Sequence, residues 1–117
     1  MTLPDIAEQL DLTYVTSDLE IDASIGITSG HVSDLLSDVI ANAPGGGVLV
    51  TIQVHMNVIA VALHADAAAV IFAGGMQPDD NVKNRAVQEK IPLFSSKKSS
   101  FDVVGELYAA GLRGFQA

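Results

Sequence analysis

The stretch GVLVTIQVHMNVIAVAL, residues 47–63, decides the fold class of this 117-residue chain. Its opening GVLVT is a short apolar run of the kind that forms a parallel strand covered on both faces. From Met56 to Ala65 the chain is apolar nearly all round, which predicts a helix that is buried or lies at an interface. Gln53, His55 and Asn57 supply polar side chains at the junction, where a strand-to-helix turn is expected.

The same alternation continues toward the C-terminus. We expect strands at AAAVIF (67–72) and IPLF (91–94), and helices at NVKNRAVQEK (81–90) and SSFDVVGELYAAG (99–111). The first of these helices places Val82, Ala86 and Val87 inward, and the second carries Phe101, Val104 and Tyr108 on one side. Strand and helix alternating in this way predict an α/β fold, in which βαβ units form a parallel sheet with helices packed on it.

The N-terminal part predicts smaller elements. TLPDIAEQL (2–10) is a short helix that Thr2 caps, and LTYVT (12–16) and LEIDASIGI (19–27) read as two short strands. HVSDLLSDVIANA (31–43) has the pattern of an amphipathic helix. Its apolar stripe consists of Val32, Leu35, Leu36, Val39 and Ile40. With no linker or repeat, we predict one domain over residues 1–117.

Composition excludes several functions. Fourteen acidic and six basic residues give a net charge of −8, which disfavours binding to nucleic acid or to an anionic membrane surface. No run approaches the length of a membrane span, and the N-terminus is not a signal peptide. The absence of cysteine fits a reducing cytoplasm, where we expect the protein to act. No P-loop, dinucleotide-binding, zinc-protease or nucleophile-elbow motif occurs.

A binding site is expected at the carboxyl edge of the predicted sheet, where open parallel sheets hold their ligands. The three loops that leave the strands there should converge, because consecutive βαβ units are neighbours. The candidate ligand-binding residues are Gln53, His55, Asn57, Gly74, Gly75, Ser96, Lys97 and Lys98. Glycines permit close approach and expose N–H groups, and lysines before a helix N-terminus favour an anion. We therefore predict a small anionic ligand, phosphate-bearing or a nucleotide.

Each of these residues also has a purely structural interpretation. A serine such as Ser99 before a helix is first of all an N-cap, and Gly74-Gly75 is a turn signal. Lys97 and Lys98 are loop charges of a kind that solvent usually covers. His55 alone is more often structural than catalytic, but it also allows a second hypothesis, a small enzyme with His55 as acid/base on an anionic substrate. A third hypothesis is a pure assembly module without a small ligand.

His31, Asp34 and Asp38 are spaced three and four residues apart, so a helix would place them along one side. Such a set could form part of a metal site. A solvated helix face is the simpler interpretation, because no fourth ligand is evident. We predict no metal and no cofactor.

From Gly30 to Gly114 the chain resembles the DRTGG domain. The resemblance is carried by SGHVSDLLSDVIANA, VLVTIQVHMNVIAVAL, AAVIFAGGMQPDDNV and IPLFSS, in that order. Domains of this family are small α/β modules, similar to the N-terminal domains of HPr kinase/phosphorylase and of Mur ligases. They occur as regulatory domains in some CBS-domain pyrophosphatases and phosphate acetyltransferases. The resemblance thus implies a regulatory or assembly role and no reaction of its own.

The letters that name the family are only partly present. The Asp-Arg pair falls on Val54 and His55, and the Thr-Gly-Gly falls on Ala73, Gly74 and Gly75. His55 could replace the arginine only as a weaker, titratable donor. We predict a non-catalytic domain that binds a ligand or a partner protein and forms a homodimer. The apolar helix from Met56 to Ala65 is the expected contact between two copies, although full burial within one copy is the alternative.

Overall fold

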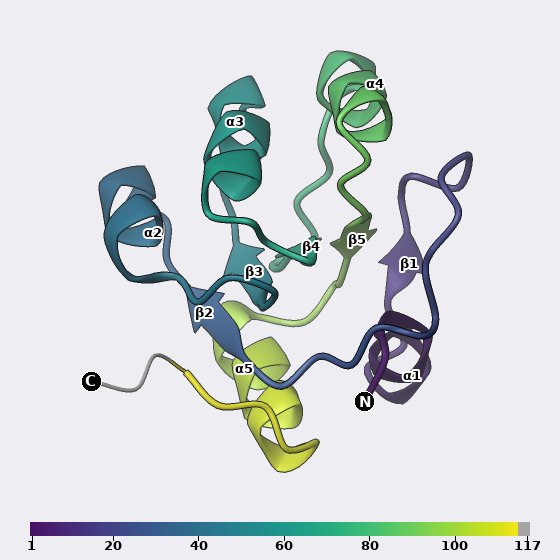
Figure 1. The fold of residues 1–117 in the computed structure, drawn as a ribbon, viewed down its shortest axis with the longest axis vertical. Helices are drawn as coiled ribbons and strands as arrows, with labels where there is room; N and C mark the ends of the chain where they lie inside the picture. The colour runs from purple at the N-terminus through teal and green to yellow at the C-terminus, as the bar shows by residue number, and fades with distance from the viewer. Residues whose placement is uncertain (115–117) are drawn as a thin grey trace.

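The computed structural model describes residues 1–114. The chain runs through five helices and five strands in these residues (Figure 1). They are α1 (Leu3–Gln9), β1 (Thr13–Tyr14), β2 (Gly30–Val32), α2 (Leu36–Asn42), β3 (Val48–Thr51), α3 (Met56–His64), β4 (Ala69–Phe72), α4 (Asp80–Gln88), β5 (Leu93–Ser95) and α5 (Ser100–Ala109). No helix among them is long and apolar enough to cross a membrane.

The strands form one sheet in the order β1-β5-β4-β3-β2. Strands β2 to β5 are parallel neighbours, and β1 pairs with β5 in the antiparallel direction at the opposite edge. The predicted run of strand, helix, strand, helix, strand and helix after residue 47 is confirmed. The predicted α/β fold with a parallel core is confirmed with it.

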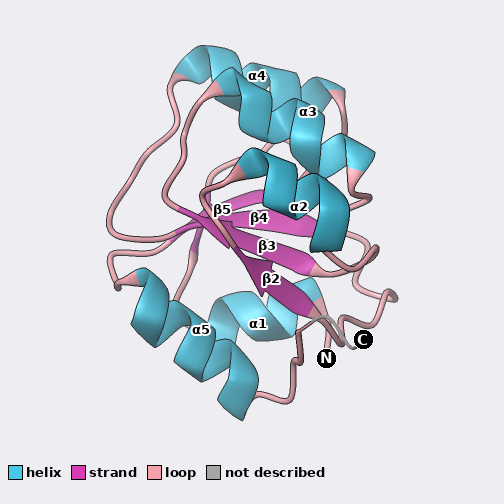
Figure 2. Cartoon of the chain, turned by 90° about the vertical axis from the view of Figure 1, so that its left-hand side faces the viewer, coloured by secondary structure: helices cyan, strands magenta, loops and turns pink. Residues whose placement is uncertain are grey.

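Helices cover both faces of the sheet. Helices α2, α3 and α4 lie on one face, and α1 and α5 lie on the other (Figure 2). Within β3, Val48 and Val50 pack toward the α1 and α5 side, whereas Leu49 packs toward the three-helix side. This double cover explains why every residue of β3 and β4 is buried and why both strands read as continuous apolar runs.

The first helix forms as its sequence predicts. The Thr2 side chain accepts a hydrogen bond from the Asp5 amide, and the Asp5 carboxylate accepts one from the Thr2 amide at 3.0 Å. This capping box satisfies two backbone donors at the helix start. Ile6 and Leu10 are buried in the core beneath the sheet, so α1 closes one end of that face.

The N-terminal third differs from the prediction in two places. The segment 31–43 is not one helix, because Gly30–Val32 is strand β2 and α2 begins only at Leu36. Pairing of β2 with β3 satisfies backbone groups and outweighs the helical periodicity of this short segment. Residues 19–27, predicted as a strand, form turns and irregular chain.

Candidate functional site

Four loops meet at the carboxyl edge of the parallel strands. They are residues 33–35, 52–55, 73–79 and 96–99. The Gly74 amide donates a 2.7 Å hydrogen bond to the Lys98 carbonyl, which joins the loops after β4 and β5. A side chain added at Gly74 would lie 3.7 Å from Ile52, in the loop after β3. The convergence that the sequence predicts is therefore confirmed, and a fourth loop takes part.

Gly74 and Gly75 join two of these loops through their backbones. Both have positive φ angles, 70° and 72°, which favour glycine. The Gly75 amide donates to the Ser96 carbonyl at 2.8 Å, just as the Gly74 amide donates to Lys98. The expectation that these glycines expose free N–H groups to a ligand is wrong, because the neighbouring loop already accepts both hydrogen bonds.

The two lysines of the loop after β5 differ in their surroundings. The Lys98 ammonium lies 2.8 and 3.0 Å from the two carboxylate oxygens of Glu106 on α5. Lys97 is exposed and forms no ion pair with any residue in 1–114. Lys97 is therefore the cation of this loop whose charge is not already balanced.

The polar residues of the opening stretch lie where β3 leads into α3. His55 is the N-cap residue of α3, but its side chain accepts no hydrogen bond from the helix amides. His55 and Asn57 are exposed, Gln53 is half-buried, and the Gln53 amide donates to the Thr51 hydroxyl at 3.1 Å. Within the described chain the His55 ring has no hydrogen-bond partner, so it remains available to other molecules.

Asp34 is a residue of this edge that the sequence prediction misplaced on a helix. Its Oδ1 accepts hydrogen bonds from the Thr51 hydroxyl at 2.8 Å and from the Ile52 amide at 2.9 Å. One carboxylate thus fixes the first turn after β3. The sequence does contain a signal for the strand that precedes Asp34. Gly30 comes before the strand candidate His31-Val32 and Ser33-Asp34 comes after it, and residues of these types often mark the ends of helices and strands.

Two further side chains shape the loop after β5. Ser96, predicted to contact a ligand, is buried, and its hydroxyl accepts a hydrogen bond from the Lys98 amide at 3.1 Å. Gln77, which the sequence prediction did not include, donates to the Ser95 hydroxyl at 3.3 Å. Ser96 therefore holds the backbone of the loop that carries the lysines.

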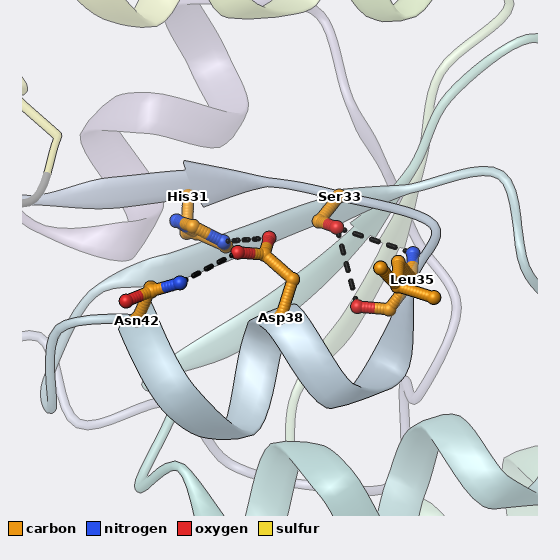
Figure 3. Close-up of polar contacts among 5 residues, drawn as sticks. All are labelled: His31, Ser33, Leu35, Asp38 and Asn42. Carbon is orange, nitrogen blue, oxygen red and sulfur yellow. Dashed lines mark hydrogen bonds and ion pairs between the residues drawn. The ribbon is translucent and has the colours of Figure 1, made fainter.

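A second polar cluster links β2 to α2 (Figure 3). His31 Nε2 lies 2.8 Å from one Asp38 carboxylate oxygen, and Asn42 donates to the other at 2.7 Å. The Asn42 hydrogen bond and then the one from His31 lower the pKa of Asp38 to about 2. His31 lies on a strand and Asp34 bonds elsewhere, so the predicted helical row is wrong. Residues 1–114 gather no three His, Cys, Asp or Glu side chains suited to a metal ion.

The fold is similar to that of a solved regulatory region of another protein. The structure is the CBS and DRTGG domains of the regulatory region of Clostridium perfringens pyrophosphatase, complexed with the activator diadenosine tetraphosphate. The two share 13% sequence identity with a TM-score of 0.70 over 91% of this chain. This chain spans 45% of the length of that solved chain, less than half. At such low identity the similarity establishes the shared fold.

Comparison by sequence gives two results. No curated protein matches the chain. The family model of the DRTGG domain matches residues 5–110, which include all five strands and all five helices but for the first two residues of α1. The match includes Gly74 and Gly75 and every loop of the carboxyl edge. The chain belongs to the DRTGG domain family.

Proposed function

We propose that this chain is a non-catalytic regulatory domain that binds a small anionic ligand at the carboxyl edge of its sheet. The observation that carries the proposal is the convergence of four loops that leave Lys97, His55 and Asn57 exposed and unpaired among residues 1–114. Polar side chains that meet on a scaffold of paired strands are the common form of a ligand site in this fold class.

The chemistry of these side chains fits a phosphate-bearing molecule. Lys97 contributes a cation, and the loop that carries it leads into the N-terminus of α5, where the helix dipole favours negative charge. His55, at the end of the loop after β3, and Asn57, in the first turn of α3, offer hydrogen bonds. The chain carries a net charge of −8, so this cation is the local feature that would attract an anion.

The similar regulatory region from Clostridium perfringens gives the first ligand to try. That protein is complexed with diadenosine tetraphosphate, an activator. We propose a nucleotide of this kind as the ligand class here, because phosphates match Lys97 and the α5 N-terminus. A role as general base for His55 is not proposed, since none of the described residues orients its ring by a hydrogen bond.

Isothermal titration calorimetry tests the ligand site. The panel contains diadenosine tetraphosphate, adenosine phosphates and inorganic phosphate. We expect binding tighter than millimolar for at least one nucleotide, and a loss of about three- to tenfold in affinity for Lys97→Ala and for His55→Ala. Lys90→Asn is the matched control. It removes a lysine at the amino ends of the parallel strands, away from the proposed site, and asparagine tolerates the φ of 59° there.

An empty panel would contradict the ligand site. A domain that binds no nucleotide but still forms a stable assembly would instead be an assembly module. Lys90→Asn weakening the affinity as much as Lys97→Ala would show non-specific attraction by charge rather than a site.

We also propose that the domain associates with a second copy of itself, in the cytoplasm. Two helices support the association, because α3 carries Met56 and Leu63 on the surface, and α5 carries Phe101 and Tyr108 there. Exposed large apolar side chains grouped on one helix are typical of contact surfaces. Light scattering over a concentration series tests this part of the proposal, and a monomer at every concentration would contradict it.

A further inference from the structure

Helix α5 has two apolar sides. Val103 and Leu107 are buried against the sheet, as expected for a helix of the core. A second row lies at Phe101, Val104, Gly105 and Tyr108, and we call it the outer stripe. Its spacing of three, four and seven residues is that of a helix face prepared to contact another helix.

The outer stripe is exposed. Phe101 is 87% exposed and Tyr108 is 58% exposed, and Val32 beside them on the edge strand β2 is 47% exposed. A shallow groove lined by Val32, Phe101, Val104 and Tyr108 runs over this surface. In Figures 1 and 2 no other described element lies beyond α5 on the side away from the sheet. The apolar surface is therefore continuous across β2 and α5.

Gly105 is unexplained by the folded chain alone. It lies in the middle of α5, where glycine is less favourable than alanine. A side chain added there would meet nothing within 4 Å, so packing within one copy does not require a glycine. On the outer stripe a glycine permits the backbone of a second helix to approach closely. Gly105 therefore marks a crossing point for another helix.

A hollow lies beside Tyr108, at the end of the outer stripe away from Phe101. It has a volume of about 300 Å³, and its apolar lining includes Val32, Val104, Tyr108 and Leu112. Phe101 projects from the first turn of α5, whereas Tyr108 is in its last turn. One copy thus presents an apolar projection at one end of the stripe and an apolar hollow at the other. A two-fold axis would fill both hollows at once, as isologous contacts do.

The charges follow the same symmetry. The N-terminal end of the stripe carries the acidic Asp102, and the guanidinium of Arg113 lies 3.7 Å from the centre of the Tyr108 ring at the other end. If two α5 helices cross antiparallel between Val104 and Gly105, Phe101 of each copy faces Tyr108 of the other. Arg113 then approaches Asp102 of the other copy twice, which favours a second copy over an unrelated acidic surface.

We propose that the outer stripe of α5 is a two-fold interface with α5 of a second copy, crossing antiparallel at Gly105. Phe101 of each copy enters the hollow beside Tyr108 of the other. This assignment rests on the self-association proposed above and names the surface that produces it. It replaces α3 as the contact between copies.

Sedimentation velocity of the full chain, from low micromolar to several hundred micromolar, tests the surface. We expect the wild type to form dimers and Phe101→Asp to weaken dimerisation at least about tenfold. Thermal unfolding monitored by circular dichroism should show that Phe101→Asp stays folded, because the side chain is exposed in one copy. Leu63→Asp is the matched control on α3, where the side chain is 50% exposed, and we expect it to dimerise like the wild type.

Charge reversal tests the direction of crossing. Asp102→Arg and Arg113→Asp should each weaken the dimer, and the double variant should recover much of the loss. Arg113 also donates to the carbonyls of Tyr108 and Leu112 in its own copy, and the double variant does not restore those bonds. Recovery therefore reports the contact between copies.

The outcomes separate this interface from the broader function. A wild type that is monomeric at every concentration overturns both the interface and the self-association, whatever the ligand titration gives. A dimer that Phe101→Asp leaves intact overturns the α5 interface alone. A dimer that only Leu63→Asp disrupts overturns it in favour of α3.

Discussion

Helices α3 and α5 have similar lengths and face opposite sides of the same sheet, yet they are covered differently. Helix α3 lies between α2 and α4 and buries Val58, Ile59, Val61 and Ala62. Among the helices of residues 1–114, α5 shares its face only with α1, and it buries Val103 and Leu107. The helix with the more apolar sequence is thus the better hidden one.

The surfaces that remain show the same contrast. On α3, Met56 is 40% exposed and Leu63 is 50% exposed, and the exposed Ala60 lies between them. On α5, Phe101 and Tyr108 are aromatic and more exposed, and a hollow lies beside Tyr108. Aromatic residues grouped near a hollow are typical of the energetic centre of an interface. This difference is why we propose α5, and not α3, as the contact between copies.

The largest effect should come from the buried sides of the two helices. Ile59→Ala on α3 and Leu107→Ala on α5 should each lower the free energy of unfolding by about 2–5 kcal/mol, because each leaves a cavity. We expect Ile59→Ala to cost more, since helices on both sides limit relaxation around it. Urea denaturation measures both. A smaller loss of unfolding free energy for Ile59→Ala than for Leu107→Ala would contradict the inference that α3 is more completely covered than α5.

The order of elements was predictable from the sequence because βαβ units are local. Each strand after residue 47 is a short apolar run, and each helix has its own local pattern, with Ser99 as a start signal for α5. Strand β2 was missed because its three residues acquire strand character only by pairing with β3, a long-range contact. Segment 31–43 on its own favours a helix.

The candidate site was predictable in place and only partly in detail. The convergence of the loops follows from topology, so Gln53, His55 and Lys97 could be assigned to one edge. Hydrogen bonding among loops does not follow from the sequence, and this decides that the Gly74 amide is occupied and that Lys98 pairs with Glu106. Phe101 was expected to lie on one side of its helix. Whether that side is exposed depends on where α1 and β2 lie, which could not be predicted from the local sequence.

The two helix starts give the next prediction. The Ser99 hydroxyl caps α5 by accepting from the Asp102 amide at 3.2 Å, whereas His55 provides no such bond for α3. Ser99→Ala should lower the free energy of unfolding by about 1 kcal/mol. His55→Ser should raise it by about 0.5 kcal/mol, because serine can cap the helix that His55 leaves uncapped. Thermal and urea unfolding measure both variants.

The cap comparison also bears on the proposed ligand site. A residue that is less favourable for stability than a common alternative at the same position often has a role in binding. His55→Ser should therefore gain stability while it loses affinity for the nucleotide in calorimetry. A His55→Ser variant that is less stable than the wild type would show that the histidine serves α3 itself.

Substitutions in the middle of α5 and of α3 should change the free energy of unfolding in opposite directions. Gly105→Ala should stabilise the monomer by up to about 1 kcal/mol, since no atom lies within 4 Å of the added methyl group. Ala60→Gly on the exposed side of α3 should destabilise it by a similar amount. Both are measured by urea unfolding of the Phe101→Asp chain, which removes the contribution of the proposed dimer. Equal and opposite shifts would show that Gly105 is retained for a reason outside the folded monomer.

The smallest effect concerns the link between β2 and α2, the helix that covers one side of α3. The pKa of Asp38 is lowered from 3.8 to about 2, first by the hydrogen bond from Asn42 and then by that from His31. A carboxyl with a lower pKa in the folded chain adds stability above its unfolded pKa, and this is lost as the pH falls toward 2. Asp38→Asn should therefore be less stable than wild type near neutral pH, and the gap should narrow between about pH 4 and pH 2.

Urea unfolding at a series of pH values measures that gap. Asn42→Ala removes the donor with the largest effect on the Asp38 pKa. The difference in stability between the wild type and Asn42→Ala should therefore narrow with falling pH much as the difference for Asp38→Asn does. In the Asp38→Asn background the same change should leave the pH dependence unaltered, because the titrating group is absent. A gap that stays constant from pH 6 to pH 2 would mean that the contact between β2 and α2 does not depend on the charge of Asp38. The cover of α3 on that side would then come from apolar packing alone, through residues such as Val39.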